Sequence, residues 1–129
     1  MMKKLIVALV ASAFALTACS NSAVKSVENV GPTEWVQKVN AGGVQVIDVR
    51  TPEEYAAGHV ANAVNINVES GSFESEIASL DKGATYALYC RSGRRSAIAA
   101  DLMSKAGFEK VINLEGGFVD ILGAGAQLG

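Results

Sequence analysis

Short apolar runs alternate along the chain with segments whose apolar residues recur at helical spacing. The runs are rich in β-branched and aromatic residues, as is typical of buried strands, and lie at residues 44–49, 63–66, 85–89 and 110–113. Between them, apolar residues stand three or four positions apart, as do Phe73, Ile77 and Leu80. The pattern predicts strands that alternate with helices.

The expected helices also have local start and stop signals. Thr51 and Glu54 form a capping box around Pro52 at the first helical position, which predicts a short helix there. Gly107 is expected to end a helix over residues 96–106 in a left-handed conformation. Further helices are expected from Pro32, at residues 73–80, and at residues 118–122 after two glycines.

Alternating strands and helices build right-handed crossovers, which give a mainly parallel sheet with helices on both faces. In such α/β domains, ligands bind at the carboxyl ends of the strands. Cys90 directly follows the strand expected at residues 85–89. It is therefore the first candidate for chemistry.

The loop Cys90-Arg91-Ser92-Gly93-Arg94-Arg95 places one cysteine and three cations at the expected start of a helix. Unpaired backbone N–H groups converge at a helix N-terminus, where they stabilise an anion such as a thiolate. Arginines there oppose the helix dipole, so an anion is expected to offset them. The loop thus favours a nucleophilic cysteine over an inert, buried thiol.

The start of the chain has the pattern of an export signal. Lys3 and Lys4 precede an apolar stretch, residues 5–16, that is short for a bilayer-spanning helix. Leu16-Thr17-Ala18-Cys19 resembles the bacterial lipobox, which implies removal of residues 1–18 and lipidation of Cys19. The alternative is an ordinary signal peptide cleaved after Ala15.

The lipobox resemblance also implies a location. Enterobacterial lipoproteins retained in the inner membrane carry an aspartate after the lipidated cysteine, and Ser20 stands there instead. We therefore expect a periplasm-facing protein of the bacterial cell envelope, anchored by lipid to the outer membrane. Residues 19–30 are expected to form the lipidated N-terminus and tether, 31–125 the domain, and 126–129 a flexible C-terminus.

Charge and cysteine content narrow the chemistry. Removal of Lys3 and Lys4 with the leader leaves nine basic against thirteen acidic residues, which disfavours nucleic-acid binding. With Cys19 lipidated, Cys90 is the sole thiol, so an internal disulfide, a CxxC pair and a cysteine-rich metal site are excluded. We expect no metal or cofactor, and a monomer.

Five ordered motifs resemble those of a single-domain rhodanese. They are residues 46–55, Gly58-His59-Val60, residues 63–66, the loop from Cys90, and Glu115-Gly116-Gly117-Phe118. The resemblance spans residues 31–125 and implies a rhodanese-like domain with a five-stranded sheet. It also implies a sulfurtransferase that takes sulfane sulfur from a small anionic donor, thiosulfate or a polysulfide, and passes it to a thiol or another thiophilic acceptor.

Carried onto this sequence, the resemblance makes Cys90 the nucleophile that carries the persulfide. The backbone N–H groups of Arg91, Ser92, Gly93, Arg94 and Arg95 would form the cradle, with Arg91 and Arg95 ranked above Arg94 as ligands of the donor's oxygens.

Other polar residues of the motifs are expected to be structural. The resemblance implies that Asp48 and Arg50 tie strand to loop, and that His59 stabilises a turn. Glu53 and Glu54 are interpreted as capping and solvated residues.

Three alternatives remain. A cysteine phosphatase carries five residues between its cysteine and arginine, whereas four separate Cys90 from Arg95, so phosphatase or arsenate reductase activity is disfavoured. A redox protein would need an external resolving thiol, and a noncatalytic binding module would not need the basic loop. Ile121 and Gln127 depart from the family pattern, so the last helix is expected to pack loosely.

Overall fold

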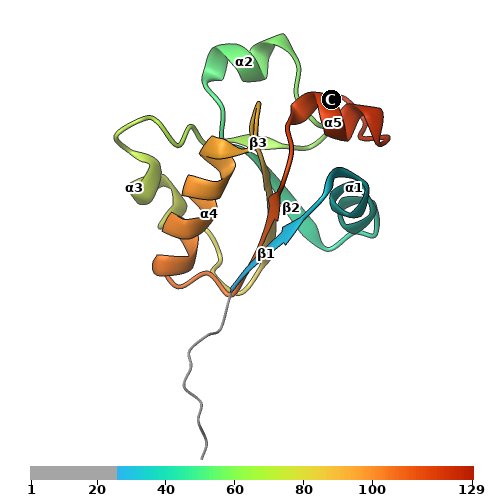
Figure 1. The fold of residues 1–129 in the computed structure, drawn as a ribbon. Coiled ribbons are helices and arrows are strands. Elements are labelled where there is room, and N and C mark those ends of the chain that lie inside the picture. The colour runs from blue at the N-terminus through green and yellow to red at the C-terminus, as the bar shows by residue number, and fades with distance from the viewer. Residues whose placement is uncertain (1–25) are drawn as a thin grey trace, which may run out of the picture.

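The structure, a computed structural model, describes residues 26–129. Its centre is a five-stranded, all-parallel sheet in the order β1-β5-β4-β2-β3, which confirms the predicted fold class (Figure 1). The strands are β1 (Val27–Val30), β2 (Val44–Asp48), β3 (Val64–Asn65), β4 (Thr85–Tyr89) and β5 (Lys110–Leu114).

Helices cover both faces of the sheet, and α2 lies beyond its carboxyl edge at the top of Figure 1. One face packs against α1 and α5, the other against α3 and α4. The helices are α1 (Pro32–Asn40), α2 (Pro52–Ala57), α3 (Phe73–Ile77), α4 (Arg94–Lys105) and α5 (Phe118–Gly123). The capping box at Thr51 and the left-handed Gly107 are both present, as expected.

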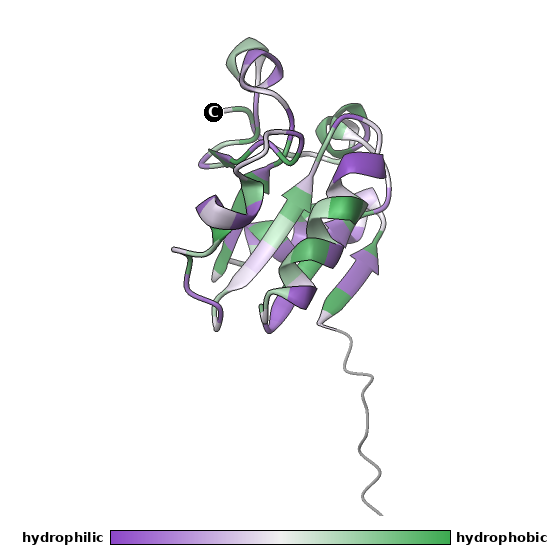
Figure 2. Ribbon diagram, turned by 90° about the vertical axis from the view of Figure 1, so that its left-hand side faces the viewer, coloured by the Kyte–Doolittle hydropathy of each residue, from purple (hydrophilic) through white to green (hydrophobic). Residues whose placement is uncertain are grey.

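Successive side chains of β4 enter the two core layers in turn, because side chains alternate along a strand. Tyr86 and Leu88 join the layer under α3 and α4, whereas Ala87 and Tyr89 join the layer under α1 and α5. Figure 2 shows hydrophobic residues along much of the strands, while hydrophobic and hydrophilic residues alternate along the helices. Cys90 continues the alternation and points toward the α4 side.

Residues 27–30 were expected to belong to a tether, and this prediction is wrong. They form β1, which pairs in parallel with β5 in the register of Val27 with Val111. The Asn113 side chain adds a hydrogen bond by donating from Nδ2 to Oδ1 of Asn29 at 2.9 Å. The remaining tether residues and the predicted leader, up to residue 25, lie outside the described residues.

The C-terminus was expected to be flexible and α5 loosely packed, and the structure corrects both predictions. Leu128 pairs with Val60 as an antiparallel bridge. The Ala61 N–H donates to the Gln127 carbonyl at 2.8 Å. Ile121 of α5 is fully buried.

Two helix boundaries also differ from the prediction. Helix α4 begins at Arg94, two residues early, because the loop enters helical geometry directly after Gly93. Helix α3 ends at Ile77, and Leu80 follows in a turn in which its N–H donates to the Ile77 carbonyl.

Removing β1 should destabilise the domain. A chain that starts at Gly31 lacks the buried Val30 and leaves the β5 edge unpaired. Its free energy of unfolding should fall by at least about 2 kcal/mol relative to a chain that starts at Ser26. Urea unfolding measures the difference, with the exposed Glu28→Ala change as the control. Equal midpoints for the two chains would contradict the assignment of β1.

Candidate active site

The Cys90 side chain is fully buried at the carboxyl end of β4, and two backbone groups hold its sulfur. The N–H of Gly93 donates to Sγ at 3.0 Å, and the N–H of Ser96 donates at 3.3 Å. Of the five residues expected to form the cradle, only Gly93 makes this contact within the described part of the chain. Ser96 was missed because the early start of α4 carries its N–H to the sulfur.

The loop holds this shape through Gly93 and the Ser96 hydroxyl. Gly93 has a φ of +105°, a conformation that side chains strongly disfavour. Its carbonyl accepts a hydrogen bond from Ser96 Oγ at 3.3 Å and another from the Ala97 N–H. Ser96 is itself fully buried. One serine therefore donates to the sulfur through its backbone and fixes the neighbouring peptide through its side chain.

The backbone of Gly116 and Gly117 packs directly against the backbone of the cysteine loop. The Phe118 N–H donates to the Arg91 carbonyl at 3.3 Å. A Cβ on Gly117 would overlap that same carbonyl oxygen, and one on Gly93 would lie 3.1 Å from the Gly116 carbonyl oxygen. The two glycine-containing backbones thus pass too close for side chains between them. The motif was seen in the sequence, but its contact with the cysteine loop was not.

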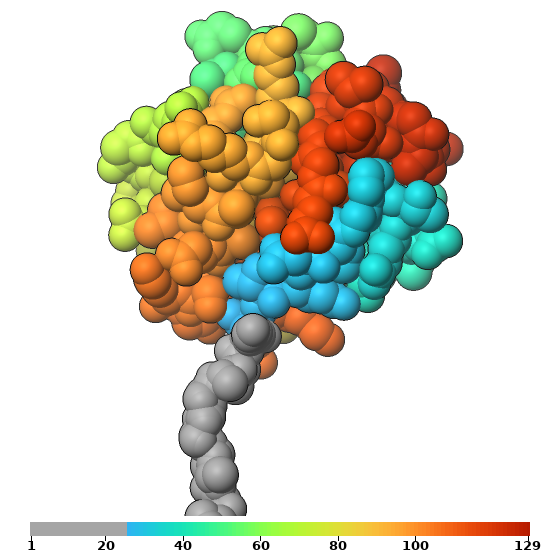
Figure 3. Space-filling model, viewed as in Figure 1, coloured from blue at the N-terminus to red at the C-terminus, as the bar shows by residue number. Residues whose placement is uncertain are grey.

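The three loop arginines have different surroundings. Arg91 and Arg94 are exposed, and neither forms an ion pair among residues 26–129. Ser92 is exposed beside them. In the space-filling view, atoms of the segment near residue 90 project between α2 and α5 at the top (Figure 3). Arg91 and Arg94 therefore place two exposed cations in the cysteine loop.

Arg95, ranked among the donor ligands, instead faces two carboxylates. It donates from Nη1 to Glu54 Oε1 at 2.7 Å and from Nη2 to Glu54 Oε2 at 3.0 Å. Glu69 Oε1 lies 3.4 Å from Nη1. The interpretation of Glu54 as a capping and solvated residue was therefore incomplete, because its second partner lies 41 positions away.

This pairing changes the titration of both residues. The hydrogen bond from Arg95 lowers the pKa of Glu54 to about 2, and the hydrogen bond to Glu54 raises the pKa of Arg95. Because the pKa of Glu54 is lowered on folding, the pair stabilises the fold above pH 4.5. That stabilisation is lost as the pH falls toward 2.

Asp48 and Arg50 lie beneath the loop and form a buried ion pair. Arg50 Nη2 donates to Asp48 Oδ2 at 2.6 Å and to the Gly58 carbonyl at 2.7 Å. The Tyr89 hydroxyl donates to the same Asp48 oxygen at 2.6 Å, and burial, then this hydrogen bond, raises the pKa of Tyr89. The Arg50 guanidinium also lies 4.3 Å from the centre of the Phe118 ring. This network joins the ends of β2 and β4 to α5.

His59 makes the contacts of a structural residue. Its Nδ1 lies 2.9 Å from the Tyr55 carbonyl oxygen, and its ring stacks on Tyr55 with the centroids 3.7 Å apart. The Gly129 N–H donates to the His59 carbonyl. These contacts hold the turn after α2 against the C-terminal segment.

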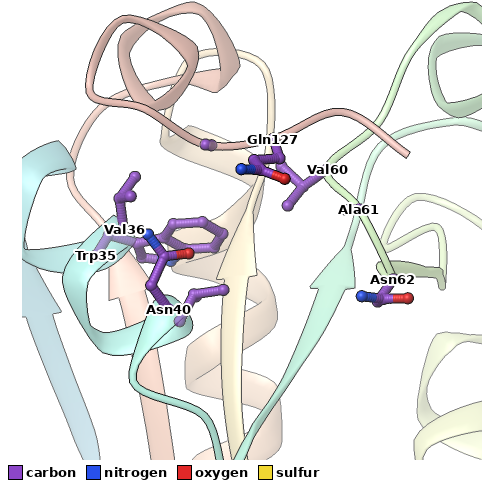
Figure 4. A pocket seen from close by; sticks show the side chains of 9 residues that line it. Trp35, Val36, Asn40, Val60, Ala61, Asn62 and Gln127 are labelled. Atoms are coloured by element: carbon purple, nitrogen blue, oxygen red, sulfur yellow. The ribbon is translucent and has the colours of Figure 1, made fainter.

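A pocket of about 350 Å³, which no residue of the Cys90 loop lines, lies between α1, the turn after α2 and the C-terminal segment (Figure 4). Its floor includes Trp35, and its rim carries the amides of Asn40, Asn62 and Gln127. No charged or nucleophilic side chain lines it. Chemistry is therefore assigned to the Cys90 loop.

No group of three or more His, Cys, Asp or Glu side chains within the described residues could hold a metal ion. In residues 26–129, no helix is both long and apolar enough to cross a membrane.

A parallel α/β domain with a cysteine loop at the carboxyl end of its central strand defines a known class. The family model for the rhodanese-like domain matches residues 31–124, and the chain belongs to that family.

Several named proteins are similar to the chain. The putative sulfur carrier protein YrkF of Bacillus subtilis is 34% identical over 81% of this chain, which spans 56% of YrkF. The thiosulfate sulfurtransferase GlpE of Pseudomonas aeruginosa is 34% identical over 66% of the chain and 76% of GlpE. The thiosulfate sulfurtransferase PspE of Escherichia coli is 40% identical over 58% of the chain and 71% of PspE.

Solved structures agree with the fold. A rhodanese-related protein from Thermoplasma volcanium matches with a TM-score of 0.68 and 26% identity, covering 78% of this chain and 96% of that one. A structure described as rhodanese with anions from E. coli matches with a TM-score of 0.52 and 38% identity, covering 60% of this chain and 91% of that one.

The close approach of Gly117 to the loop predicts a position-specific effect of alanine. Gly117→Ala should lower the free energy of unfolding by about 2 kcal/mol or more, because the new Cβ overlaps the Arg91 carbonyl. Gly123→Ala, at the other end of α5, meets nothing within 4 Å and should be neutral or stabilising by up to about 1 kcal/mol. Thermal or urea unfolding of both variants decides, and equal effects would refute the contact.

Proposed function

We propose that the chain is a sulfurtransferase, which moves sulfane sulfur from thiosulfate or a related anionic donor to a thiophilic acceptor through a persulfide on Cys90. The observation that carries the proposal is the Cys90 sulfur, which receives two N–H donors at a helix start next to two exposed arginines. The similar proteins GlpE and PspE are named thiosulfate sulfurtransferases, which supports the same activity here.

The first half of the proposed reaction forms the persulfide. The Cys90 thiolate attacks the outer sulfur of thiosulfate, and a new S–S bond forms as the donor's own S–S bond breaks. Sulfite leaves with the bonding electron pair. Arg91 and Arg94 attract the donor and neutralise the charge on its oxygens, since both are exposed and unpaired among the described residues.

The second half returns the enzyme to its starting state. A thiol or another thiophilic acceptor, in its nucleophilic form, attacks the outer sulfur of the persulfide, and the Cys90 thiolate is the leaving group. The N–H groups of Gly93 and Ser96 stabilise that thiolate when it re-forms. No metal or cofactor enters the scheme.

Thiosulfate should load Cys90 with sulfur. After incubation of the reduced protein with thiosulfate, intact-mass spectrometry should show a gain of one sulfur atom on Cys90, and added cyanide should release thiocyanate. Cys90→Ser is the control and should show neither result. If the reduced wild-type protein forms no persulfide and no thiocyanate, the enzymatic function is wrong and the noncatalytic binding module is favoured. Turnover of an aryl phosphate would instead favour the phosphatase alternative.

We also propose that the protein is exported and anchored by a lipid on Cys19 in the bacterial cell envelope, facing the periplasm from the outer membrane. The basic residues Lys3 and Lys4, the apolar stretch and the lipobox-like end support this. All strands of the sheet are parallel, so β1 begins at the end opposite to Cys90. An anchor at Cys19 would therefore join the domain at the end of the sheet opposite to the cysteine loop.

Lipidation can be tested in bacteria that express the whole chain. A clickable fatty acid fed to the cells should label the wild-type protein and place it in the membrane fraction. Cys19→Ala should abolish both results, whereas Cys90→Ser, a matched cysteine change, should leave them intact. Labelling that persists in Cys19→Ala, or that is absent from the wild type, would disprove the anchor.

A further inference from the structure

Arg95 is the loop arginine whose guanidinium is already occupied. Both of its terminal nitrogens donate to the Glu54 carboxylate in a bidentate arrangement, at 2.7 and 3.0 Å. Arg–carboxylate pairs of this form have the same planar geometry by which Arg binds other oxyanions. A sulfonate bound to Arg95 in the same bidentate way would need the positions that the Glu54 oxygens occupy.

The position of Arg95 links this pair to the cysteine. Arg95 lies in the first turn of α4, between Gly93 and Ser96, the two residues whose N–H groups hold the sulfur. Electrostatic interaction with Cys90 is also among the causes that raise the pKa of Arg95, after the Glu54 contacts. Arg95 thus belongs to the electrostatic surroundings of the nucleophile.

We propose that Glu54 is a built-in competitor of the sulfur donor: it occupies Arg95 in the empty enzyme, and a bound oxyanion must displace it. This inference rests on the proposed function, because it takes the Cys90 loop as the donor site. It assigns Glu54 a part in selecting the donor, as a positioning residue that acts through Arg95.

One oxygen of the Glu54 carboxylate keeps hydrogen-bond partners when the carboxylate leaves Arg95. Glu54 Oε1 also accepts from the Thr51 N–H and from Thr51 Oγ1, both at 3.1 Å. Helix α2, which carries Glu54, contributes no fully buried residue. A small movement of Glu54 therefore breaks no core packing.

Competition with Glu54 also selects among donors. A dianion with several oxygens, such as thiosulfate, can satisfy Arg95 as fully as the carboxylate does. A polysulfide has no oxygens with which to replace Glu54. Because the pKa of Glu54 is about 2, ordinary acidity does not release Arg95, so displacement requires a competing anion. The site therefore favours donors that carry oxyanion oxygens, such as thiosulfate, over polysulfides.

Inorganic sulfate, an unreactive dianion, tests the competition without any turnover. The dissociation constant of sulfate is measured by NMR titration at neutral pH and fixed ionic strength, on the whole reduced chain and three variants. Glu54→Gln keeps the oxygen that caps Thr51 and removes the charge. Glu69→Gln removes the more distant carboxylate at 3.4 Å. Glu53→Gln removes an exposed neighbouring charge and is the matched control.

Glu54→Gln should bind sulfate about three- to tenfold more tightly than the wild type, with Arg95 shifting on titration. Glu69→Gln should show a smaller gain, and Glu53→Gln should match the wild type. Unchanged or weaker binding by Glu54→Gln overturns the proposal, as does an equal gain in Glu53→Gln or the absence of binding in all four proteins. If Glu54→Gln fails to fold, Glu69→Gln decides, and no gain there overturns the proposal. None of these results depends on persulfide formation, so failure of the enzymatic function stays distinguishable.

Discussion

The sulfur of Cys90 is withdrawn from solvent at the end of the central strand, where the N–H groups of Gly93 and Ser96 point at it. Much of the site's architecture follows from this placement. Both N–H groups reach one atom because the chain reverses at Gly93 in a left-handed conformation and enters α4 at once. A buried anion would be costly without such donors, so the loop geometry and the chemistry of the thiol depend on one another.

The cysteine loop needs rigid structural support, and the buried Asp48–Arg50 ion pair provides it. Asp48 ends β2 and Arg50 follows two residues later, while Tyr89 ends β4 immediately before Cys90. Burying two charges carries a large desolvation cost, which is offset here by close geometry and by further hydrogen bonds to Gly58 and Tyr89. Arg50 also contacts the Phe118 ring, and the Phe118 N–H donates to the Arg91 carbonyl. The buried ion pair is therefore connected to the cysteine loop through Phe118.

Local patterns predicted the central strands, the capping box at Thr51 and the cysteine loop, because each depends on residues close in sequence. The features that were missed depend on distant partners. Residues 27–30 look polar and short, and they become a strand only because β5 offers an edge more than eighty positions later. The C-terminal segment is ordered for the same reason, through its pairing near Val60. Glu54 shows both cases, since its capping role follows from local spacing and its bond to Arg95 does not.

The three arginines of the cysteine loop differ in their charged neighbours. Three cations at or just before the start of α4 would oppose its dipole and repel one another, so at least one is expected to have a carboxylate partner. Arg95 has two such partners, Glu54 and Glu69, while Arg91 and Arg94 are exposed to solvent. On a chain of net negative charge, this leaves a local positive site that attracts small anions toward the cysteine. The carboxylates of Glu54 and Glu69 thus offset part of the positive charge that the loop concentrates beside Cys90.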